Sequence, residues 1–311
     1  MAAAGGNNQV GLALGSGSAR GWAHIGVIRA LMELGIEPDI VCGTSIGALV
    51  GAFYVTGNLD SLEEWTRGLH KHDVLQFIDI KLLPRGGLLE GDRIVQFLQD
   101  SIGDREIADL PKPFAAVATD LLTGQEIWLT TGSLVEAVRA SVSVPCIFTP
   151  VTYGEHLLVD GGLVDPVPVS ACKALGADVI LAVNLNSEVL GKHICQAKRS
   201  KTRAKASNSE PKFLHALSAG LKKWTSSLGA SISDSLVDTL SFFDVMNGSL
   251  SIMQNYIVRS RLADDQPDVT INPRVVDIGF LDFDKAAEAI AEGKRAVERI
   301  GSELHDLIRT R

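Results

Sequence analysis

Several features that mark other classes of protein are missing from this sequence of 311 residues. It contains no run of about 18 apolar residues, so we expect no membrane-spanning helix. Residues 1–9 have neither a basic segment nor an apolar core, so we do not expect them to act as a secretory signal. The cysteines are far apart and form no C-x-x-C pair: Cys42, Cys146, Cys172 and Cys195. A disulfide scaffold or zinc ribbon is therefore not expected, and we predict free thiols in a reducing cytosol.

The sequence also lacks an excess of basic residues. Its net charge is −8, whereas nucleic-acid-binding proteins more often have a basic balance or a basic stripe, so we expect no nucleic-acid partner. One basic cluster is present, because residues 191–212 hold seven Lys or Arg against one Glu. With 46% apolar and 21% charged residues, the composition is that of a globular protein and not of a disordered or fibrous one.

Short apolar runs alternate with helical segments along most of the sequence. Residues 10–14 form an apolar run, and a helix follows that ends at Gly35. Residues 40–42 form a second run, which precedes a helix that is apolar on all sides and is therefore expected in a core. This alternation of strand and helix is typical of a parallel sheet.

Similar patterns continue toward the C-terminus. Strands are predicted at residues 114–119, 127–130, 156–159, 179–184 and 269–271, and helices within 60–109 and at 134–141 and 283–310. We predict one three-layer α/β/α domain over residues 8–311, with a mostly parallel central sheet. Within it, residues 191–248 are predicted to form an insert, made of a mobile basic loop and an amphipathic helical stretch.

The strongest local motif is Gly43-Thr44-Ser45-Ile46-Gly47, a G-x-S-x-G sequence between a predicted strand and a predicted helix. A serine on such a tight turn has its hydroxyl exposed, and the two glycines let the strand and the helix approach closely. The N–H of Ile46 and the start of the helix would then face a developing oxyanion. A chance glycine-rich turn is the alternative, but the flanking apolar strand and buried helix favour a catalytic serine.

A serine nucleophile needs a base. The late histidines lie in polar or amphipathic segments with no motif around them: His193, His215 and His305. Asp160-Gly161-Gly162, in contrast, follows a predicted strand and can hold a carboxylate at the strand end. An aspartate can act as the base directly if burial raises its pKa. The alternative is a turn aspartate that caps its own backbone.

Residues 15–21, with the sequence Gly-Ser-Gly-Ser-Ala-Arg-Gly, form another strand-to-helix turn. Its backbone N–H groups can converge on an anion, either a phosphate or an oxyanion. A dinucleotide-binding loop would need glycine at the position of Arg20. It would also need an acidic residue at the end of the second strand, whereas Asp39 stands at the start of that strand. His24, one turn into the following helix, is expected near this loop. Asp120 and Asp165 are alternative acidic residues, and their sequence context favours turn-forming roles for both.

Taken together, these three motifs resemble those of the patatin-like phospholipases over residues 8–189, and the resemblance resumes at 249–293. It implies a patatin-like α/β fold and a catalytic dyad of Ser45 and Asp160 without a histidine. The resemblance also implies that the segment Gly17-Ser18-Ala19 donates backbone N–H groups to the oxyanion, while Arg20 supports that loop.

The sequence departs from the family pattern at three positions. The glycine loop of the family usually has three consecutive glycines, whereas Ser16 and Ser18 stand here in place of two of them. Serine is strained wherever the backbone φ angle is positive. Cys146 stands where the family often has glycine and can narrow the acyl pocket. Residues 140–145 also resemble a family signature near the acyl site.

We therefore predict a serine acyl-hydrolase that cleaves carboxylic ester bonds of (lyso)phospholipids or other lipids through an acyl-enzyme, without metal or cofactor. A thioesterase or small-ester hydrolase, and a non-catalytic module that binds a ligand or partner on the same fold, are the alternatives. Residues 192–228 are predicted to contact a membrane surface, and the alternative for them is a solvated loop and a core helix. The expected location is the cytoplasm, with peripheral contact at the inner membrane face.

Overall fold

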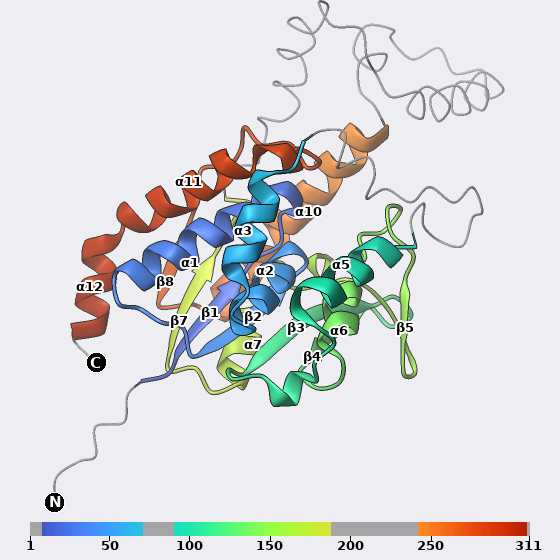
Figure 1. The fold of residues 1–311 in the computed structure, drawn as a ribbon, viewed down its shortest axis with the longest axis horizontal. Coiled ribbons are helices and arrows are strands. Elements are labelled where there is room, and N and C mark those ends of the chain that lie inside the picture. Colours follow the sequence, from blue (N-terminus) through green and yellow to red (C-terminus); the bar gives the residue numbers. More distant parts are fainter. Residues whose placement is uncertain (1–7, 71–89, 188–241, 310–311) are drawn as a thin grey trace, which may run out of the picture. The chain divides into compact units, whose positions relative to one another are not determined.

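The computed structural model describes residues 8–70, 90–187 and 242–309 (Figure 1). The chain divides into two compact units, residues 1–188 together with 256–311, and residues 189–255. In the second unit, the described residues belong to the first part of one helix. Most of the predicted insert, including the predicted membrane contact at 192–228, lies outside the described residues and stays a prediction.

The first unit contains a central sheet of eight strands with helices around it (Figure 1). The strands are β1 (Val10–Leu14), β2 (Ile40–Thr44), β3 (Phe114–Asp120), β4 (Glu126–Leu129), β5 (Val151–Tyr153), β6 (His156–Asp160), β7 (Val179–Val183) and β8 (Val269–Ile271). The α-helices are α1 (Ala23–Glu33), α2 (Ile46–Val55), α3 (Leu59–Arg67), α5 (Asp92–Ile102), α6 (Leu134–Ser141), α7 (Val169–Ala174), α10 (Phe242–Asp264), α11 (Ala286–Glu298) and α12 (Gly301–Arg309). The 3-10 helices are η1 (Ser18–Trp22), η2 (Ile107–Asp109), η3 (Gly161–Leu163) and η5 (Phe283–Lys285).

The strands follow the order β5-β6-β3-β2-β1-β7-β8, and β4 pairs with β3. Strands β3, β2, β1, β7 and β8 are parallel to one another. Strands β4 and β6 pair with β3 in antiparallel fashion, and β5 pairs with β6 in the same way. Because β1 lies between β2 and β7, the chain reverses its direction of progress across the sheet at β1. The predicted α/β fold with a mostly parallel central sheet is confirmed.

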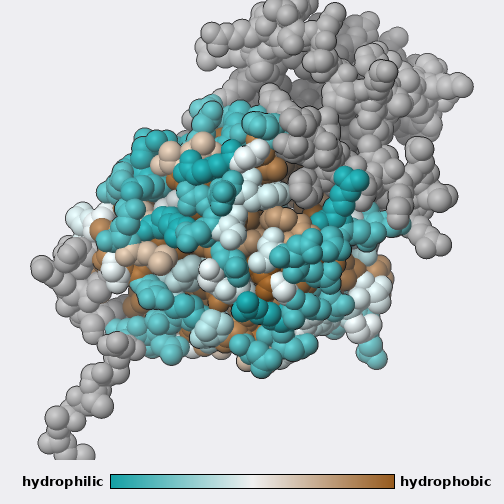
Figure 2. All heavy atoms as spheres, in the orientation of Figure 1, coloured by the Kyte–Doolittle hydropathy of each residue, from teal (hydrophilic) through white to brown (hydrophobic). Residues whose placement is uncertain are grey.

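Apolar side chains are buried on both faces of the sheet. One core contains the inward faces of α1, α2, α3, α5, α6 and α11, together with residues such as Leu12, Leu14 and Val41 from the strands. The other core contains α7 and the strand residues of opposite orientation, among them Ala13 and Cys42. Period-2 alternation along β1 therefore supplies both cores. In Figure 2, hydrophilic residues predominate on the visible face, with apolar residues showing between them. Among the described helices, none is long and apolar enough to cross a membrane.

One sequence expectation for the fold is corrected. The single helix predicted at 283–310 is interrupted, because η5 precedes α11 and a separate helix begins at Gly301. The N–H of Ile300 bonds to the carbonyl oxygen of Val297, a tighter 3-10 turn that ends α11 just before a glycine of weak helix propensity. Strand β5, helix α7 and most of helix α10 are additional elements that the sequence patterns do not predict.

Helices α1 and α11 lie side by side and pack with almost no space between their backbones (Figure 1). A Cβ atom at Gly26 of α1 would stand 1.9 Å from the carbonyl oxygen of Ile290 in α11. Reciprocally, a Cβ atom at Gly293 of α11 would stand 1.9 Å from the carbonyl oxygen of Ala23 in α1. Glycine at both positions therefore permits the close approach, which no side-chain rotation could relieve.

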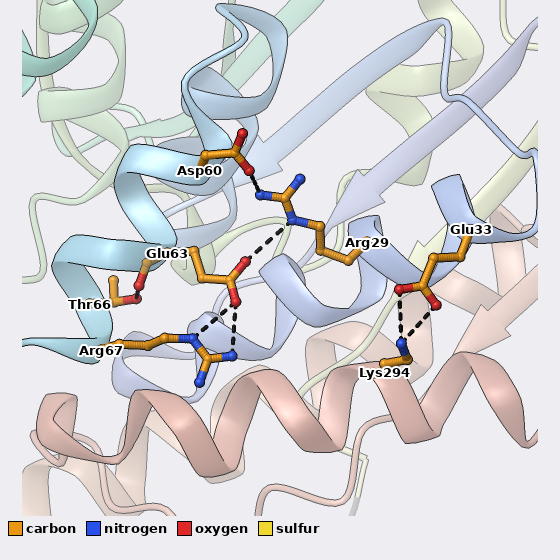
Figure 3. A network of polar contacts seen from close by, with 7 residues as sticks. All are labelled: Arg29, Glu33, Asp60, Glu63, Thr66, Arg67 and Lys294. Carbon is orange, nitrogen blue, oxygen red and sulfur yellow. Dashed lines mark hydrogen bonds and ion pairs between the residues drawn. The ribbon is translucent and has the colours of Figure 1, made fainter.

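Ion pairs surround this helix contact, as Figure 3 shows. Arg29 of α1 pairs with Asp60 and Glu63 of α3, and Lys294 of α11 pairs with Glu33 of α1 at 2.7 Å. The Asp60 and Glu33 side chains are largely exposed, and exposed pairs typically contribute about 0–1 kcal/mol each. The close glycine packing, rather than these pairs, is thus expected to dominate the stability of the contact.

We expect the substitution Gly26→Ala to destabilise the protein by at least about 2 kcal/mol, because the new methyl group meets backbone atoms of α11. The melting temperature should fall by about 2–4 °C per kcal/mol. Gly301→Ala is the matched control, since a Cβ atom there meets nothing within 4 Å and alanine favours the helix. Equal melting temperatures for the two variants would contradict the close packing of α1 on α11.

Candidate active site

The three predicted motifs meet at the carboxyl ends of the parallel strands. The loop of residues 15–21 follows β1, and Ser45 follows β2 directly. Asp160 ends β6, which runs antiparallel to β3 and pairs Asp160 with Ala118. On the same edge, one residue earlier, β3 pairs Val117 with Thr44, while β4 occupies the opposite edge. Strand β3 therefore holds the nucleophile turn and the acid turn one residue apart. The site lies where the strand order reverses, which is where open α/β sheets commonly bind ligands.

Ser45 occupies a strained turn. Its backbone angles are φ 57° and ψ −123°, and non-glycine residues are uncommon at positive φ. Glycine is required on both sides, because a Cβ atom at Gly43 would lie 2.4 Å from the Ala48 nitrogen and one at Gly47 would lie 2.1 Å from the Leu14 oxygen. The sharp strand-to-helix turn predicted from the G-x-S-x-G motif is thus present.

The Ser45 hydroxyl donates a hydrogen bond to Oδ2 of Asp160. The other carboxylate oxygen, Oδ1, accepts the N–H of Gly162 at 2.7 Å, and Thr119 Oγ1 donates to the Asp160 carbonyl oxygen at 2.8 Å. Asp160 is only 4% exposed, and this burial raises its pKa to about 6, although the bonds from Ser45 and Gly162 lower it in part. The carboxyl group is therefore oriented by its turn and has a raised proton affinity, as a general base requires.

Some backbone N–H groups of the glycine loop already have acceptors, whereas others can bind an anion. The N–H groups of Ser16 and Arg20 donate to the carbonyl oxygens of Pro166 and Gly17. In the part of the chain that the structure describes, no acceptor takes the N–H of Gly17, Ser18 or Ile46. Together with the positive end of α2, these three groups can stabilise a negative charge beside Ser45.

Ala19 is a correction to the predicted set of donors. Its N–H donates to the carbonyl oxygen of Phe280 at 3.2 Å and is therefore already in use. Ser18 shows the strain expected of serine in this loop, because its φ angle is 51°. The Ser18 hydroxyl donates to the same Phe280 oxygen at 2.7 Å, which offsets part of that strain. Cys146 likewise has a positive φ angle of 67°.

Two buried side chains fix the carbonyl groups of the glycine loop. Arg20 Nε donates to the Gly17 oxygen at 3.2 Å, and His24 Nε2 lies 2.7 Å from the Gly15 oxygen. Burial lowers the pKa of Arg20 to about 10 and that of His24 to about 4, so at neutral pH Arg20 is charged and His24 is neutral. Gly21 lets the Ile46 side chain approach the loop, which brings the two groups of N–H donors together.

Asp165 lies beside the Ser45 turn, because its carbonyl oxygen accepts the Thr44 hydroxyl at 2.8 Å, while its carboxylate accepts Ser170 Oγ at 3.1 Å. The remaining candidates are Asp120 and the late histidines. Asp120 accepts the N–H of Leu122 and pairs with His156 at 3.2 Å, as a turn former does. His193 and His215 lie outside the described residues, as does the side chain of His305. Within the described ranges, no three His, Cys, Asp or Glu side chains are grouped so that they could hold a metal ion.

Residues 12–173 match the family model described as Patatin-like phospholipase, and this match covers more than half of the chain. The chain belongs to the patatin-like phospholipase family. An uncharacterized NTE family protein of Mycobacterium tuberculosis is 40% identical over 183 residues, which are 59% of this chain and 51% of that protein. The Neuropathy target esterase sws of Drosophila melanogaster is 36% identical over 58% of this chain and 13% of its own length.

Patatin-like phospholipase domain-containing protein 7 of mouse is 33% identical over 58% of this chain and 14% of its own length. The chain thus matches about half of the mycobacterial relative and a small part of the two animal proteins. The names of the two animal relatives are those of an esterase and of a phospholipase domain-containing protein.

Proposed function

We propose that this protein hydrolyses carboxylic esters of lipids, (lyso)phospholipids among them, with Ser45 as nucleophile and Asp160 as general base. The observation that carries the proposal is the direct hydrogen bond from the Ser45 hydroxyl to the buried Asp160 carboxylate. The two groups are ready for proton transfer without an intervening histidine. The family resemblance and the lipid-esterase names of the relatives support the same class of substrate.

In the first half of the reaction, Ser45 Oγ forms a bond to the acyl carbon while its proton passes to Asp160. The negative charge that develops on the acyl oxygen is held by the N–H groups of Gly17, Ser18 and Ile46, and one such donor contributes roughly 3 kcal/mol to transition-state stabilisation. The bond to the leaving alcohol then breaks, and the alcohol oxygen takes the proton from Asp160.

Water completes the second half. It attacks the acyl carbon of the Ser45 ester as Asp160 takes one of its protons, and the same N–H groups hold the new negative charge. Breaking of the bond to Ser45 Oγ releases the fatty acid, and Asp160 returns the proton to Ser45. One carboxylate therefore serves as base and then as acid in each half of the cycle.

Covalent labelling tests this function. A fluorophosphonate should modify the folded protein, peptide mass spectrometry should locate the adduct at Ser45, and Ser45→Ala should retain its fold but lose the label. A panel of phospholipid, lysophospholipid, acyl-CoA and p-nitrophenyl ester should then show turnover of lipid carboxylic esters. Preference for acyl-CoA would favour a thioesterase. Absence of both labelling and turnover in folded protein would favour a binding module.

A further inference from the structure

We infer that Ser141 is a positioning residue that holds the nucleophile turn in its working conformation; this inference rests on the proposed function. Ser141 is the last residue of α6 and is fully buried. Its Oγ accepts the backbone N–H of Ser45 at 2.8 Å, across 96 positions of the sequence. The same Oγ donates to the carbonyl oxygen of Val117 in β3 at 2.6 Å.

The direction of these two bonds is fixed by chemistry. A hydroxyl has one hydrogen to donate, and a carbonyl oxygen can only accept, so Ser141 must donate to Val117. Its oxygen is therefore left to accept the N–H of Ser45. Residue Val117 lies within the sheet, where its register places it beside Thr44 and Trp128. Ser141 thus connects the nucleophile turn to a rigid strand through a fixed donor and a fixed acceptor.

Ser45 needs such support because of its backbone conformation. A residue with a side chain stays in this positive-φ conformation only when its surroundings hold it there. The bond to Ser141 fixes the plane of the peptide group that precedes Ser45. Through the two torsions of Ser45, that plane determines where the hydroxyl lies and where the N–H of Ile46 is directed. Ser141 consequently positions the nucleophile and one oxyanion donor together.

The chain just after Ser141 also holds the base. The carbonyl oxygen of Ser143 accepts the backbone N–H of Asp160 at 2.9 Å. The hydroxyl of Ser143 accepts Arg139 Nη1 at 2.6 Å, so a buried guanidinium fixes this segment in turn. Residues 141–143 therefore connect to both members of the Ser45–Asp160 pair, which are 115 positions apart.

The test compares Ser141→Ala with variants that separate hydrogen bonding from packing. Ser141→Thr keeps the hydroxyl, whereas Ser141→Cys preserves the shape but offers only a weak acceptor. Thr66→Val is the matched control, because it removes a buried hydroxyl that bonds within α3, away from the site. The cysteine variant keeps the test decisive if truncation to alanine prevents folding.

Three readouts are measured: the second-order rate of fluorophosphonate labelling, the kcat and KM for a soluble ester, and the residue-resolved hydrogen exchange of the Ser45 amide. For Ser141→Ala and Ser141→Cys, we expect labelling and kcat to fall about 10- to 100-fold with little change in KM, as for a small misplacement of a reacting group. The Ser45 amide should exchange at least about 10-fold faster, because it has lost its acceptor. The labelling rate, kcat and amide exchange of Ser141→Thr should be closer to those of wild type, and Thr66→Val should have the same values as wild type.

The outcomes separate this inference from the proposed function. If wild type is labelled and Ser141→Cys is labelled at the same rate with unchanged amide exchange, Ser141 does not position the nucleophile although the hydrolase remains. If wild type is neither labelled nor active on any ester, the hydrolase proposal fails, and amide exchange still decides whether Ser141 holds the Ser45 backbone. Equal losses in Ser141→Ala, Ser141→Thr and Thr66→Val would overturn the inference in favour of general packing.

Discussion

Asp160→Asn should reduce turnover of a soluble ester by about 10²–10⁴-fold while making the folded protein more stable at pH 8. The loss of activity follows because an amide cannot accept the Ser45 proton, and general base catalysis supplies about 10²–10⁴-fold. Binding should survive, since the amide is the same size as the carboxyl group. Its oxygen can still accept the N–H of Gly162, and its NH₂ can donate to Ser45 Oγ.

The gain in stability follows from the raised pKa of Asp160. Burial raises the pKa of the folded state to about 6, above the usual unfolded value of about 3.9, so the folded state binds the proton more tightly. Stability that this group contributes at low pH is lost as pH rises from about 4 to about 6. At pH 8 the charged carboxyl group therefore costs about 3 kcal/mol of unfolding free energy, which the neutral amide avoids.

Chemical unfolding of wild type and Asp160→Asn at pH 8 and pH 4.5 measures this difference. The variant should be more stable at pH 8, and the gain should shrink at pH 4.5. Asp120→Asn is a control of opposite sign, because His156 and the N–H of Leu122 hold the pKa of Asp120 below its usual range. That variant should lose stability at pH 8. If the Asp160→Asn protein stays active, Asp160 is not the base, and another group must accept the Ser45 proton.

Local sequence patterns were sufficient to predict the bounds of elements that contain a clear apolar run. The runs at residues 10–14 and 269–271 predicted β1 and β8 with the observed bounds. The pattern at 134–141 did the same for α6, where Ser133 caps the first turn by accepting the N–H of Glu136. Strand β5 has no such run, because its three residues lie at an edge and are partly exposed.

The site was predictable only as far as its motifs are local. The turn around Ser45 is encoded by glycines two residues away, so a short window of sequence is enough to recognise it. The bond from Ser45 to Ser141 and the bond from Ala19 to Phe280 join residues far apart in the chain. Such contacts depend on how α6 and residues before η5 pack against the sheet, and no periodicity or spacing reports that packing.

The proposed reaction has a pH dependence that distinguishes Asp160 from His24, because burial shifts their pKa values in opposite directions. With Asp160 as base, kcat/KM requires the ionised carboxylate, whose pKa burial raises to about 6. The value should be constant above pH 7 and fall about tenfold per pH unit below pH 6, to about one hundredth of the plateau at pH 4. A soluble p-nitrophenyl ester should be used, so that the physical state of a lipid does not vary with pH.

A base at His24 would give a different profile, because burial lowers its pKa to about 4. Activity would then stay near its plateau down to about pH 5, with a midpoint near 4. His24→Gln is the matched variant, since its side-chain amide can still donate to the Gly15 oxygen that His24 contacts. A midpoint near 6 in both wild type and His24→Gln assigns the titration to Asp160. If the midpoint lies near 4 in wild type and is absent in His24→Gln, His24 is the base and the proposed dyad is wrong.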